Sequence, residues 1–550
     1  MTRILYLYTE ETTHRGKAGG QDLAAWLGAE SGAQIELVVT SDLDALIGLP
    51  DGGYEAVVIN THGDADDLTP KRERGLLSFV ANGGGCVAVH AAAVSGRNSR
   101  PYVAMLNGAY QSYEPLQEFP VVIQDQNHYL TVRMPDFRIT DEIYHLRDFD
   151  PARCKVLATT HWQGRQLPMV YVREHGQGRV AYIALGHGEE AWRHVEFKKL
   201  LLRAIRWSRG ADLSDRVLRW GVVGFSGMAR AHVKWATGTP GIKMVGMCDI
   251  NPECVAQAQA DFPTLSGCYT HLDDLLAMPD LDVITAVVPH SDHEPVTVQA
   301  LRAGKHVVVE KPFSCTVAEA DSMINTARET GKTLSVFHQR RWDGDYMLIR
   351  DLMQRGLLGD VFHLEAFIGG YNRLGPEWRN LKHKSGSVML DWGAHFIDWI
   401  LGIAGGKVVQ VYGDFQKRMW HQATVEDYGQ ANIRFDNGVT ASFTISSLAA
   451  LNRPKWYIMG TKGTLRTDLD TWDQLRLVTY AAGIRQDCTF RVENKDFQGQ
   501  HYYRYLADHL LMGEEVPVTP ESARRVIAIV EAATTSSELG ISQPVQAGCE

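Results

Sequence analysis

The sequence predicts an α/β protein with several domains: two α/β regions followed by an α+β region. Three observations lead to this prediction. At 550 residues the chain is too long for a single hydrophobic core. Strand and helix patterns alternate over residues 1–209 and again over 216–338. Strand patterns then follow one another in residues 339–550, which is typical of an antiparallel sheet.

The first region alternates short apolar, β-branched runs with amphipathic helical patterns, which predicts a parallel sheet. Its predicted strands are Ile4–Tyr8, Gln34–Thr40, Ala56–Asn60 and Cys86–His90, and its predicted helices are Gly20–Gly32, Leu43–Ile47 and Thr69–Asn82. The last strand ends in a sharp turn at His90 before small residues, which is the geometry of a nucleophile elbow with His in place of Ser or Cys. Cys86 lies four residues before this turn and is expected in the core.

A short polar segment, Ser208–Asp215, marks the domain boundary, with residues 210–215 as the linker. The second region then repeats the α/β pattern and predicts a complete dinucleotide-binding domain over 216–338. Its predicted strands are Val217–Val223, Lys243–Cys248, Leu281–Val288, Val307–Glu310 and Thr333–Phe337, and its predicted helices include His271–Met278, Glu294–Gly304 and Val317–Gly331.

A glycine-rich turn between the first strand and helix of this region predicts a nucleotide site, because backbone N–H groups at a helix N-terminus bind pyrophosphate. The pattern is Gly-x-Ser-x-x-Ala, and the candidate residues are Gly224, Ser226, Gly227, Met228 and Ala229. Asp249 ends the second strand, 25 residues after Gly224, where a carboxylate accepts hydrogen bonds from the ribose and repels a 2′-phosphate. Ile250 follows it, so we expect NAD rather than NADP; the alternative is a surface Asp in a turn.

The third region, 339–550, is predicted as an α+β substrate and oligomerisation domain. Its predicted strands are Val361–Gly369, Val408–Phe415, Thr424–Phe435, Val439–Ser446, Trp456–Met459, Gly463–Arg466 and Gln474–Thr479. Asp436-Asn-Gly438 is a hairpin turn signal. Helix Glu521–Leu539 is expected to pack back on the nucleotide domain, and an open sheet face suggests a homo-oligomer.

Three ionisable residues are candidates for proton transfer. Lys311 follows the valine strand and Glu310 at the carboxyl end of the predicted sheet, where such sheets bind ligands. Burial there lowers a lysine pKa and allows proton exchange near neutrality. Asp391 and His395 stand four apart in a predicted helix and so share one face. The alternatives are a lysine that reaches solvent and an Asp-x-x-x-His spacing that arises by chance.

Residues 1–209 resemble the ThuA-like (trehalose-utilisation) family, which has the class I glutamine-amidotransferase-like (flavodoxin-like) fold. The resemblance is carried by Gly83–Ala92, by the motifs at 127–128, 141–144 and 178–188, and more weakly by 13–15. The amidotransferase cysteine is missing here, as in that family. The resemblance implies a pocket that handles a sugar, plausibly a keto-sugar, through acid/base groups or a divalent metal. Its candidate residues are His14, His62, His90, His128, Glu142 and His187. The alternative is that each His is a hydrogen-bonded structural residue.

Residues 216 to about 545 resemble the glucose–fructose oxidoreductase/inositol dehydrogenase/MocA family. The resemblance is carried by the glycine-rich turn, by 303–312 (Ala-Gly-Lys-His-Val-Val-Val-Glu-Lys-Pro), by 338–342 and by Asp391-x-x-x-His395. It implies that Lys311 positions the substrate hydroxyl and relays a proton, that His395 is the base or acid, and that Asp391 orients substrate or imidazole. It also implies cofactor contacts from Pro289, His293, Glu310 and Lys311, and a sugar pocket with Arg341, Tyr371, Trp378 and Arg379. Ser385-Gly-Ser replaces the usual Gly-Gly-Gly of the family.

These resemblances lead us to expect an NAD-dependent sugar dehydrogenase. It would oxidise a sugar or glycoside hydroxyl, and the first domain would process the resulting keto-sugar. One alternative is an enzyme that cleaves a glycosidic bond through transient oxidation by NAD. Another is a dehydrogenase whose first domain only binds sugar.

Composition excludes several other functions. The net charge is −10 and the pI about 6.1, which argues against nucleic acid or an anionic membrane as the main partner. No apolar run approaches the ~20 residues that span a bilayer. The eight cysteines are scattered without a Cys-x-x-Cys pair, and the N-terminus reads as a strand rather than a signal peptide. A cytoplasmic location is the simplest expectation.

Overall fold

The computed structural model describes residues 2–10, 14–29, 35–63, 67–469, 472–481, 483–492 and 499–545. The chain forms two compact units. The first comprises Met1–Asp215 with Gly513–Glu515, and the second comprises Arg216–Met512 with Val516–Glu550. Each unit is described by itself.

The first unit contains a nine-stranded sheet of order β2-β1-β3-β4-β9-β8-β7-β5-β6. Its strands are β1 (Thr2–Tyr8), β2 (Ile35–Thr40), β3 (Ala56–Asn60), β4 (Gly85–Val89), β5 (Ala109–Ile123), β6 (Phe137–Arg147), β7 (Lys155–Trp162), β8 (Arg165–His175) and β9 (Gly178–Ile183). Its α-helices are α1 (Gly16–Ala29), α2 (Pro70–Ala81), α3 (Arg100–Leu106), α4 (Glu189–Arg193) and α5 (Val195–Ser208), with 3₁₀ helices η1 (Leu43–Leu46), η2 (Leu49–Asp51), η3 (His90–Ala93) and η4 (Pro151–Arg153).

Only half of this sheet is parallel. Strands β2, β1, β3, β4 and β9 run parallel, and β3 and β4 are buried along their whole length, as expected for strands covered on both faces. Strands β5 to β8 form an antiparallel extension that the alternation pattern did not predict. The largely exposed β5 contains two register irregularities, so it shows no simple alternation of apolar and polar residues. The extension matters because β6 carries Glu142.

The first helix begins earlier than predicted. Glycines Gly19 and Gly20 lie inside α1 rather than at its start. An added Cβ would come within 2.7 Å of Trp192 at Gly19 and of Val39 at Gly20, so these glycines allow the helix to approach the sheet closely. The predicted end at Gly32 lies outside the described residues.

The second unit begins with a six-stranded parallel sheet of order β12-β11-β10-β13-β14-β15. The order reverses between β10 and β13, and open α/β sheets bind ligands at such a switch point. The strands are β10 (Leu218–Val223), β11 (Ile242–Cys248), β12 (Gly267–Tyr269), β13 (Val283–Ala286), β14 (His306–Val309) and β15 (Leu334–Val336). The helices are α6 (Gly227–Thr237), α7 (Pro252–Asp261), α8 (Leu272–Leu276), η5 (His290–Asp292), α9 (His293–Arg302), α10 (Val317–Thr330) and η6 (Gln339–Trp342).

A second nine-stranded sheet follows, with order β23-β22-β21-β20-β16-β19-β18-β17-β24. Its strands are β16 (Val361–Gly369), β17 (Val408–Gln416), β18 (Tyr428–Phe435), β19 (Thr440–Ser446), β20 (Trp456–Gly460), β21 (Gly463–Thr467), β22 (Gln474–Ala481), β23 (Ile484–Arg491) and β24 (Gln543–Pro544). The accompanying helices are α11 (Gly344–Gln354), η7 (Trp378–Asn380), α12 (Lys382–Ser385), α13 (Val388–Asp391), α14 (Gly393–Ala404), α15 (Gly499–Met512) and α16 (Pro520–Leu539).

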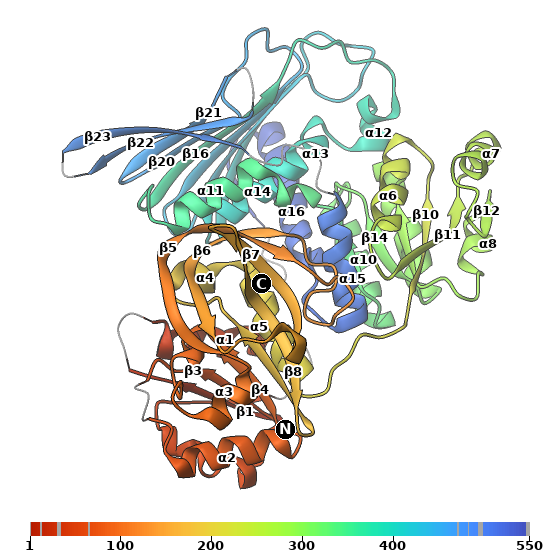
Figure 1. Cartoon of the computed structure of the whole chain (residues 1–550). Coiled ribbons are helices and arrows are strands. Elements are labelled where there is room, and N and C mark those ends of the chain that lie inside the picture. The colour runs from red at the N-terminus through yellow and green to blue at the C-terminus, as the bar shows by residue number, and fades with distance from the viewer. Residues whose placement is uncertain are drawn as a thin grey trace. The chain divides into compact units, whose positions relative to one another are not determined.

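This sheet is antiparallel except for the β16–β19 pair, and α11, α14 and α16 lie on one side of it (Figure 1). Gly438 takes φ +87° in the β18–β19 hairpin turn, as the Asn-Gly signal predicts. The sequence did not predict β23, whose residues are nearly all exposed and mostly polar, so that no regular alternation marks it. It also did not predict α11 and α15.

Helix α16 contacts α10 and β15 of the parallel-sheet region and also β17 of the second sheet. Gly413 on β17 permits this packing, because an added Cβ would overlap the carbonyl of Ala533 on the helix. The Gly413 N–H also donates to Ser536 Oγ at 3.0 Å.

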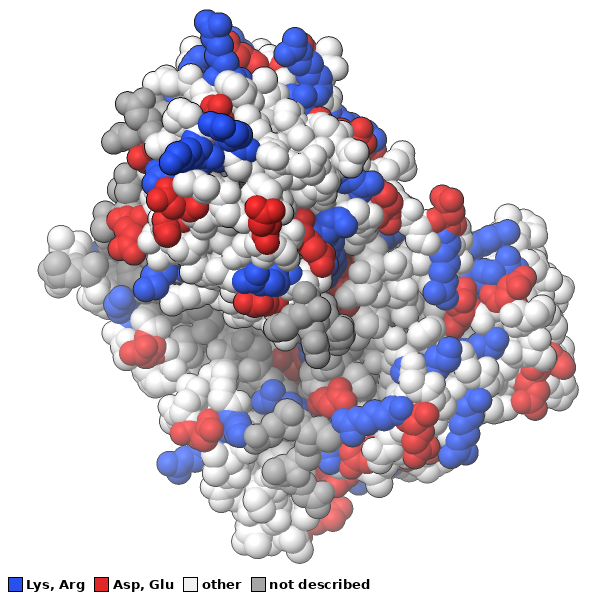
Figure 2. Space-filling model, turned by 90° about the horizontal axis from the view of Figure 1, so that it is seen from below, with Lys and Arg blue, Asp and Glu red and all other residues white. Residues whose placement is uncertain are grey.

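No helix within the described residues is long and apolar enough to cross a membrane. On the face shown in Figure 2, basic and acidic side chains are interspersed over much of the surface.

Candidate functional site

A cavity of about 830 Å³ in the second unit brings most of the predicted site residues together. It is lined by residues from the glycine-rich turn and by the three candidate proton-transfer residues. The predicted residues that line it are Gly224, Ser226, Met228, Asp249, Pro289, Glu310, Lys311, Trp378, Arg379, Asp391 and His395.

The glycine-rich turn lies between β10 and α6. Gly224 has φ +87°, and an added Cβ would overlap the carbonyl of Val287, so only glycine fits this turn. Ser226 is the N-cap of α6 and accepts from the N–H of Ala229 at 3.4 Å. Asp249 Oδ2 accepts from the Phe225 N–H at 2.7 Å, which fixes the carboxylate beside the turn. The remaining N–H groups of the first turn of α6 have the geometry with which a helix N-terminus can bind an anion.

Lys311 and Asp391 form an ion pair at the cavity wall. The Lys311 ammonium donates to Asp391 Oδ1 at 2.8 Å and to the Asp391 carbonyl at 3.0 Å. Burial alone raises the pKa of Asp391, but the adjacent ammonium outweighs burial and holds that pKa below its usual value. Asp391 is therefore ionised at neutral pH and holds the Lys311 side chain in one position.

His395 is 3% exposed, and burial together with the Lys311 charge lowers its pKa well below 6.5. Its imidazole is neutral at pH 7 and can accept a proton. The prediction of one helix carrying both Asp391 and His395 is wrong. Asp391 ends α13, Trp392 interrupts the helix, and His395 lies in the first turn of α14. Both side chains still line the same cavity.

Glu310 is held by a buried hydrogen-bond chain that sequence reasoning missed. Its Oε2 accepts from the Lys311 N–H at 2.7 Å, and its Oε1 lies 3.1 Å from His232 Nε2. The other nitrogen of His232 lies 2.7 Å from the Tyr503 hydroxyl. His232 lies on the helix that follows the glycine-rich turn, where its distance in sequence from Glu310 concealed the contact. The chain fixes the backbone at Lys311.

Five predicted residues do not line the cavity. Arg341 instead donates to both oxygens of Asp398, at 2.8 and 2.6 Å, and Arg340 lines the cavity in its place. Tyr371 is exposed, and its hydroxyl contacts Met419. His293 is fully buried between the carbonyls of Pro312 and Val288. The last two, Gly227 and Ala229, lie in the first turn of α6.

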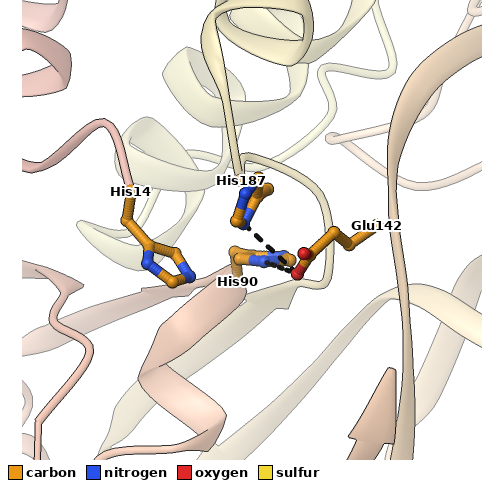
Figure 3. Close-up of side chains that lie close together, drawn as sticks. All are labelled: His14, His90, Glu142 and His187. Atoms are coloured by element: carbon orange, nitrogen blue, oxygen red, sulfur yellow. Dashed lines mark ion pairs between the residues drawn. The ribbon is translucent and has the colours of Figure 1, made fainter. Parts of the chain in front are cut away.

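A second cluster lies in the first unit (Figure 3). His14, His90, Glu142 and His187 each offer one ligand atom, and these atoms all lie within 4.8 Å of one another. Glu142 Oε2 is 3.5 Å from His90 Nε2 and 3.2 Å from His187 Nδ1. The four residues come from the loop before α1, the end of β4, strand β6 and the segment after β9.

His90 occupies the sharp turn predicted from the sequence, with φ +40°. Its Nδ1 lies 2.7 Å from the Ala184 carbonyl and donates to it, which leaves the lone pair on Nε2 facing Glu142. A histidine held in this tautomer can act as a metal ligand or as a base.

Asp141 is a second residue that sequence reasoning did not assign to the site. Its fully buried carboxylate accepts from the N–H groups of Gly186, His187 and Glu142, and so holds two members of the cluster together. Burial raises the pKa of Asp141. Burial alone would raise the pKa of Glu142, but the neighbouring His187 and His90 outweigh burial and lower that pKa to about 2. The pKa of His187 rises because of Glu142.

The other two predicted histidines, His62 and His128, differ in their position relative to the cluster. The His62 ring stacks on His14 with centroids 4.5 Å apart, directly beside the cluster. His128 is not brought into the cluster. Its Nδ1 accepts from the Leu130 N–H at 3.2 Å, and its ring packs 5.4 Å from Trp207, so it caps a local turn. Burial lowers the pKa of His128 to about 4.

Comparisons with known proteins match both units. Family models match residues 3–208 (trehalose utilisation, ThuA), 218–338 (oxidoreductase family, NAD-binding Rossmann fold) and 346–466 (GFO/IDH/MocA C-terminal domain).

Among relatives, scyllo-inositol 2-dehydrogenase (NADP(+)) IolW of Bacillus subtilis (strain 168) is 27% identical over 308 residues, covering 51% of this chain and 84% of that protein. The 1,5-anhydro-D-fructose reductase of Ensifer adhaerens is 29% identical over 251 residues, which cover 45% of this chain and 74% of that protein. A solved structure of an NAD-binding protein from Listeria innocua matches with a TM-score of 0.55 and 26% identity, covering 60% of this chain and 97% of that one. The chain is therefore a ThuA domain fused to an oxidoreductase of the GFO/IDH/MocA family.

Proposed function

We propose that the second unit transfers a hydride between a sugar or glycoside hydroxyl and NAD, forming a keto-sugar that the ThuA domain then processes. The observation that carries the proposal is the single cavity lined both by the glycine-rich turn with Asp249 and by Lys311, Asp391 and His395. The two relatives named for an inositol and an anhydro-sugar support a polyhydroxylated substrate.

The side chains in this cavity suit loss of a hydroxyl proton. NAD, when bound, supplies the hydride acceptor. His395 is neutral at pH 7 and acts as the base that takes the hydroxyl proton. The Lys311 ammonium, anchored by Asp391, donates a hydrogen bond to the same oxygen and favours its anionic form. Asp391, whose pKa lies below its usual value, stays ionised and holds the ammonium in place.

Asp249 supports NAD over NADP. Its carboxylate is oriented by the N–H groups of Phe225 and Asn251, so its negative charge stays beside the turn. Ile250, which follows it, is 91% exposed and offers no positive charge. The nearby Arg230 is bound to Asp261 at 2.8 Å. Replacing Asp249 with Ser should raise kcat/KM for NADP relative to NAD.

The ThuA cluster fits a divalent metal, because three imidazole nitrogens and a carboxylate oxygen are a common donor set for such ions. His14, His90, His187 and Glu142 would hold the ion. When bound it would polarise a sugar carbonyl. Elemental analysis of the purified protein tests this, and Glu142→Gln should lower the metal content whatever the activity.

The dehydrogenase is tested by incubating the purified protein with NAD and a panel of sugars and glycosides while recording NADH absorbance. NADH formation with at least one of them is expected. If no sugar reduces the cofactor, the dehydrogenase assignment is wrong. Release of free sugar without net NADH would instead identify an enzyme that cleaves glycosides through transient oxidation.

A further inference from the structure

Two basic side chains in the oxidoreductase cavity have no acidic partner. Arg379 on η7 and Lys384 on α12 both line the cavity, and α12 packs against η7. Among the residues that the structure describes, neither side chain pairs with a carboxylate within 4 Å. Arg379 is exposed at the rim, with its guanidinium 4.3 Å from the Trp378 ring centroid, and Lys384 is half-buried.

The acidic residues that line the cavity are already engaged. Asp391 pairs with Lys311, and Glu310 binds the Lys311 N–H and His232. Asp249 accepts from two backbone N–H groups beside the turn. Asp292 accepts from the Ser291 hydroxyl. The positive charge of Arg379 and Lys384 is therefore left for a ligand.

These two basic residues flank the reacting end of the cavity. The Trp378 ring packs edge-on against His290, with centroids 5.0 Å apart, and His290 Nδ1 donates to the carbonyl of Ser385, next to Lys384. Arg379 also contributes to the low pKa of Asp391, although Lys311 contributes more and burial opposes both. A group bound by Arg379 and Lys384 thus lies in the same cavity as Lys311 and Asp391, on the side where Arg379 acts on Asp391.

We propose that the sugar oxidised here carries an anionic group, a carboxylate or a phosphate, which Arg379 and Lys384 bind. This inference rests on the proposed dehydrogenase function and specifies its substrate class. The planar guanidinium binds either anion through two parallel hydrogen bonds, and the ammonium adds a point charge. The group is held at the cavity rim, where partial exposure limits its desolvation.

The first test compares kcat/KM for matched substrates with NAD and the full-length protein. The pairs are methyl β-glucoside with methyl β-glucuronide, and glucose with glucose 6-phosphate. We expect a charged member to exceed its neutral partner by about 10-fold or more, with the advantage shrinking as salt rises because screening weakens the attraction. An advantage in the glucuronide pair would identify the anionic group as a carboxylate, and an advantage in the glucose 6-phosphate pair would identify it as a phosphate. Equal or higher values for both neutral sugars would overturn the inference.

The second test uses Arg379→Gln and Lys384→Met. Each should lower kcat/KM for the charged sugar at least 10-fold more than for the neutral one. Arg373→Gln is the matched control, because Arg373 is exposed in the preceding loop and does not line the cavity; it should leave the ratio unchanged. If the variants weaken NAD binding but leave the ratio of kcat/KM for the charged sugar to kcat/KM for the neutral sugar unchanged, the two basic residues bind the cofactor. That result would overturn the inference.

Failure of the proposed function is distinguishable from failure of this inference. If no sugar yields NADH, the dehydrogenase assignment fails. Calorimetric titration of methyl glucuronide and glucose 6-phosphate into the wild type and the two variants then tests whether Arg379 and Lys384 bind an anion. Binding that the variants abolish supports it, and no binding to the wild type overturns it.

Discussion

Lys311 connects the two halves of the oxidoreductase site. Its backbone is fixed by the Glu310–His232 chain, and its ammonium is fixed by Asp391. A sequence can predict that a lysine ends a buried strand. It cannot predict that His232 of α6 contacts Glu310, since the two residues lie 78 positions apart in the chain.

We predict that Lys311→Met lowers kcat about 10²–10⁴-fold, because the hydroxyl oxygen loses its proton donor and its stabilising charge. Lys311→Arg should lower it comparably, because the planar guanidinium keeps the charge but does not fit the position of the compact ammonium between Asp391 and the substrate oxygen. Steady-state rates with saturating NAD measure both. An Arg variant within threefold of the wild type would show that only the charge matters.

The burial of His338 leads us to predict that the stability of the protein depends on pH. It is 1% exposed, and burial lowers its pKa to about 4. Below pH 6.5 the unfolded chain therefore binds a proton that the native chain does not, so the free energy of unfolding falls as pH falls from 6.5 toward 4. The slope from one such group is about 1.4 kcal/mol per pH unit.

His338→Asn should remove that contribution. Urea unfolding between pH 6 and 5 should show a slope shallower by about 1.4 kcal/mol per pH unit, even if the variant is less stable overall. His383→Asn is the control, since His383 is exposed on the short helix α12 and should leave the slope unchanged. An unchanged slope in the His338 variant would mean that this residue is protonated in the native state.

The neighbouring residues Arg340 and Arg341 show that the sequence alone does not determine which side chain lines the cavity. The family resemblance places Arg341 in the sugar pocket, but Arg340 lines the cavity while Arg341 is bound to Asp398. Successive residues of the 3₁₀ helix η6 point in different directions. Only the position of Asp398, on a helix far along the chain, decides which arginine is used.

At the scale of elements, the packing of α16 depends on one glycine. We predict that Gly413→Val destabilises the protein by about 2–4 kcal/mol, because the side chain would overlap the Ala533 carbonyl and push α16 away from β17. Thermal unfolding of the variant measures this loss. Gly48→Ala, where nothing lies within 4 Å of an added Cβ, is the control and should change stability little.

The parallel strands β1 to β4, β10, β11 and β13 to β15 were predicted to within a few residues, because strands buried on both faces are continuous apolar runs, as in β3, β4 and β14. The parallel strands β9 and β12 were not predicted. The antiparallel strands β5 to β8 and β23 were missed, because exposure and bulges remove the period-two pattern. The break at Trp392 was also missed, since the apolar sequence around it favours a continuous helix.

At the scale of the whole molecule, fusion of the two modules argues for coupled chemistry. A keto-sugar is reactive, and a second site on the same chain meets it at a higher effective concentration than a separate protein would. The homo-oligomer expected from the sequence stays a prediction. The ThuA cluster and the oxidoreductase cavity each consist of residues from one unit only, so each site can be altered separately.

We therefore predict two complementary losses. Glu142→Gln should spare NADH formation but let keto-sugar accumulate, because it removes the carboxylate between His90 and His187. Lys311→Met should form keto-sugar from a glycoside about 10²–10⁴-fold more slowly, yet consume added keto-sugar at the wild-type rate. Cofactor absorbance and chromatography of the sugars separate the steps. His128→Ala is the control, because His128 lies outside the cluster and should spare both steps. If the Glu142 variant still clears the keto-sugar, the ThuA domain does not process it, and the fusion requires another explanation.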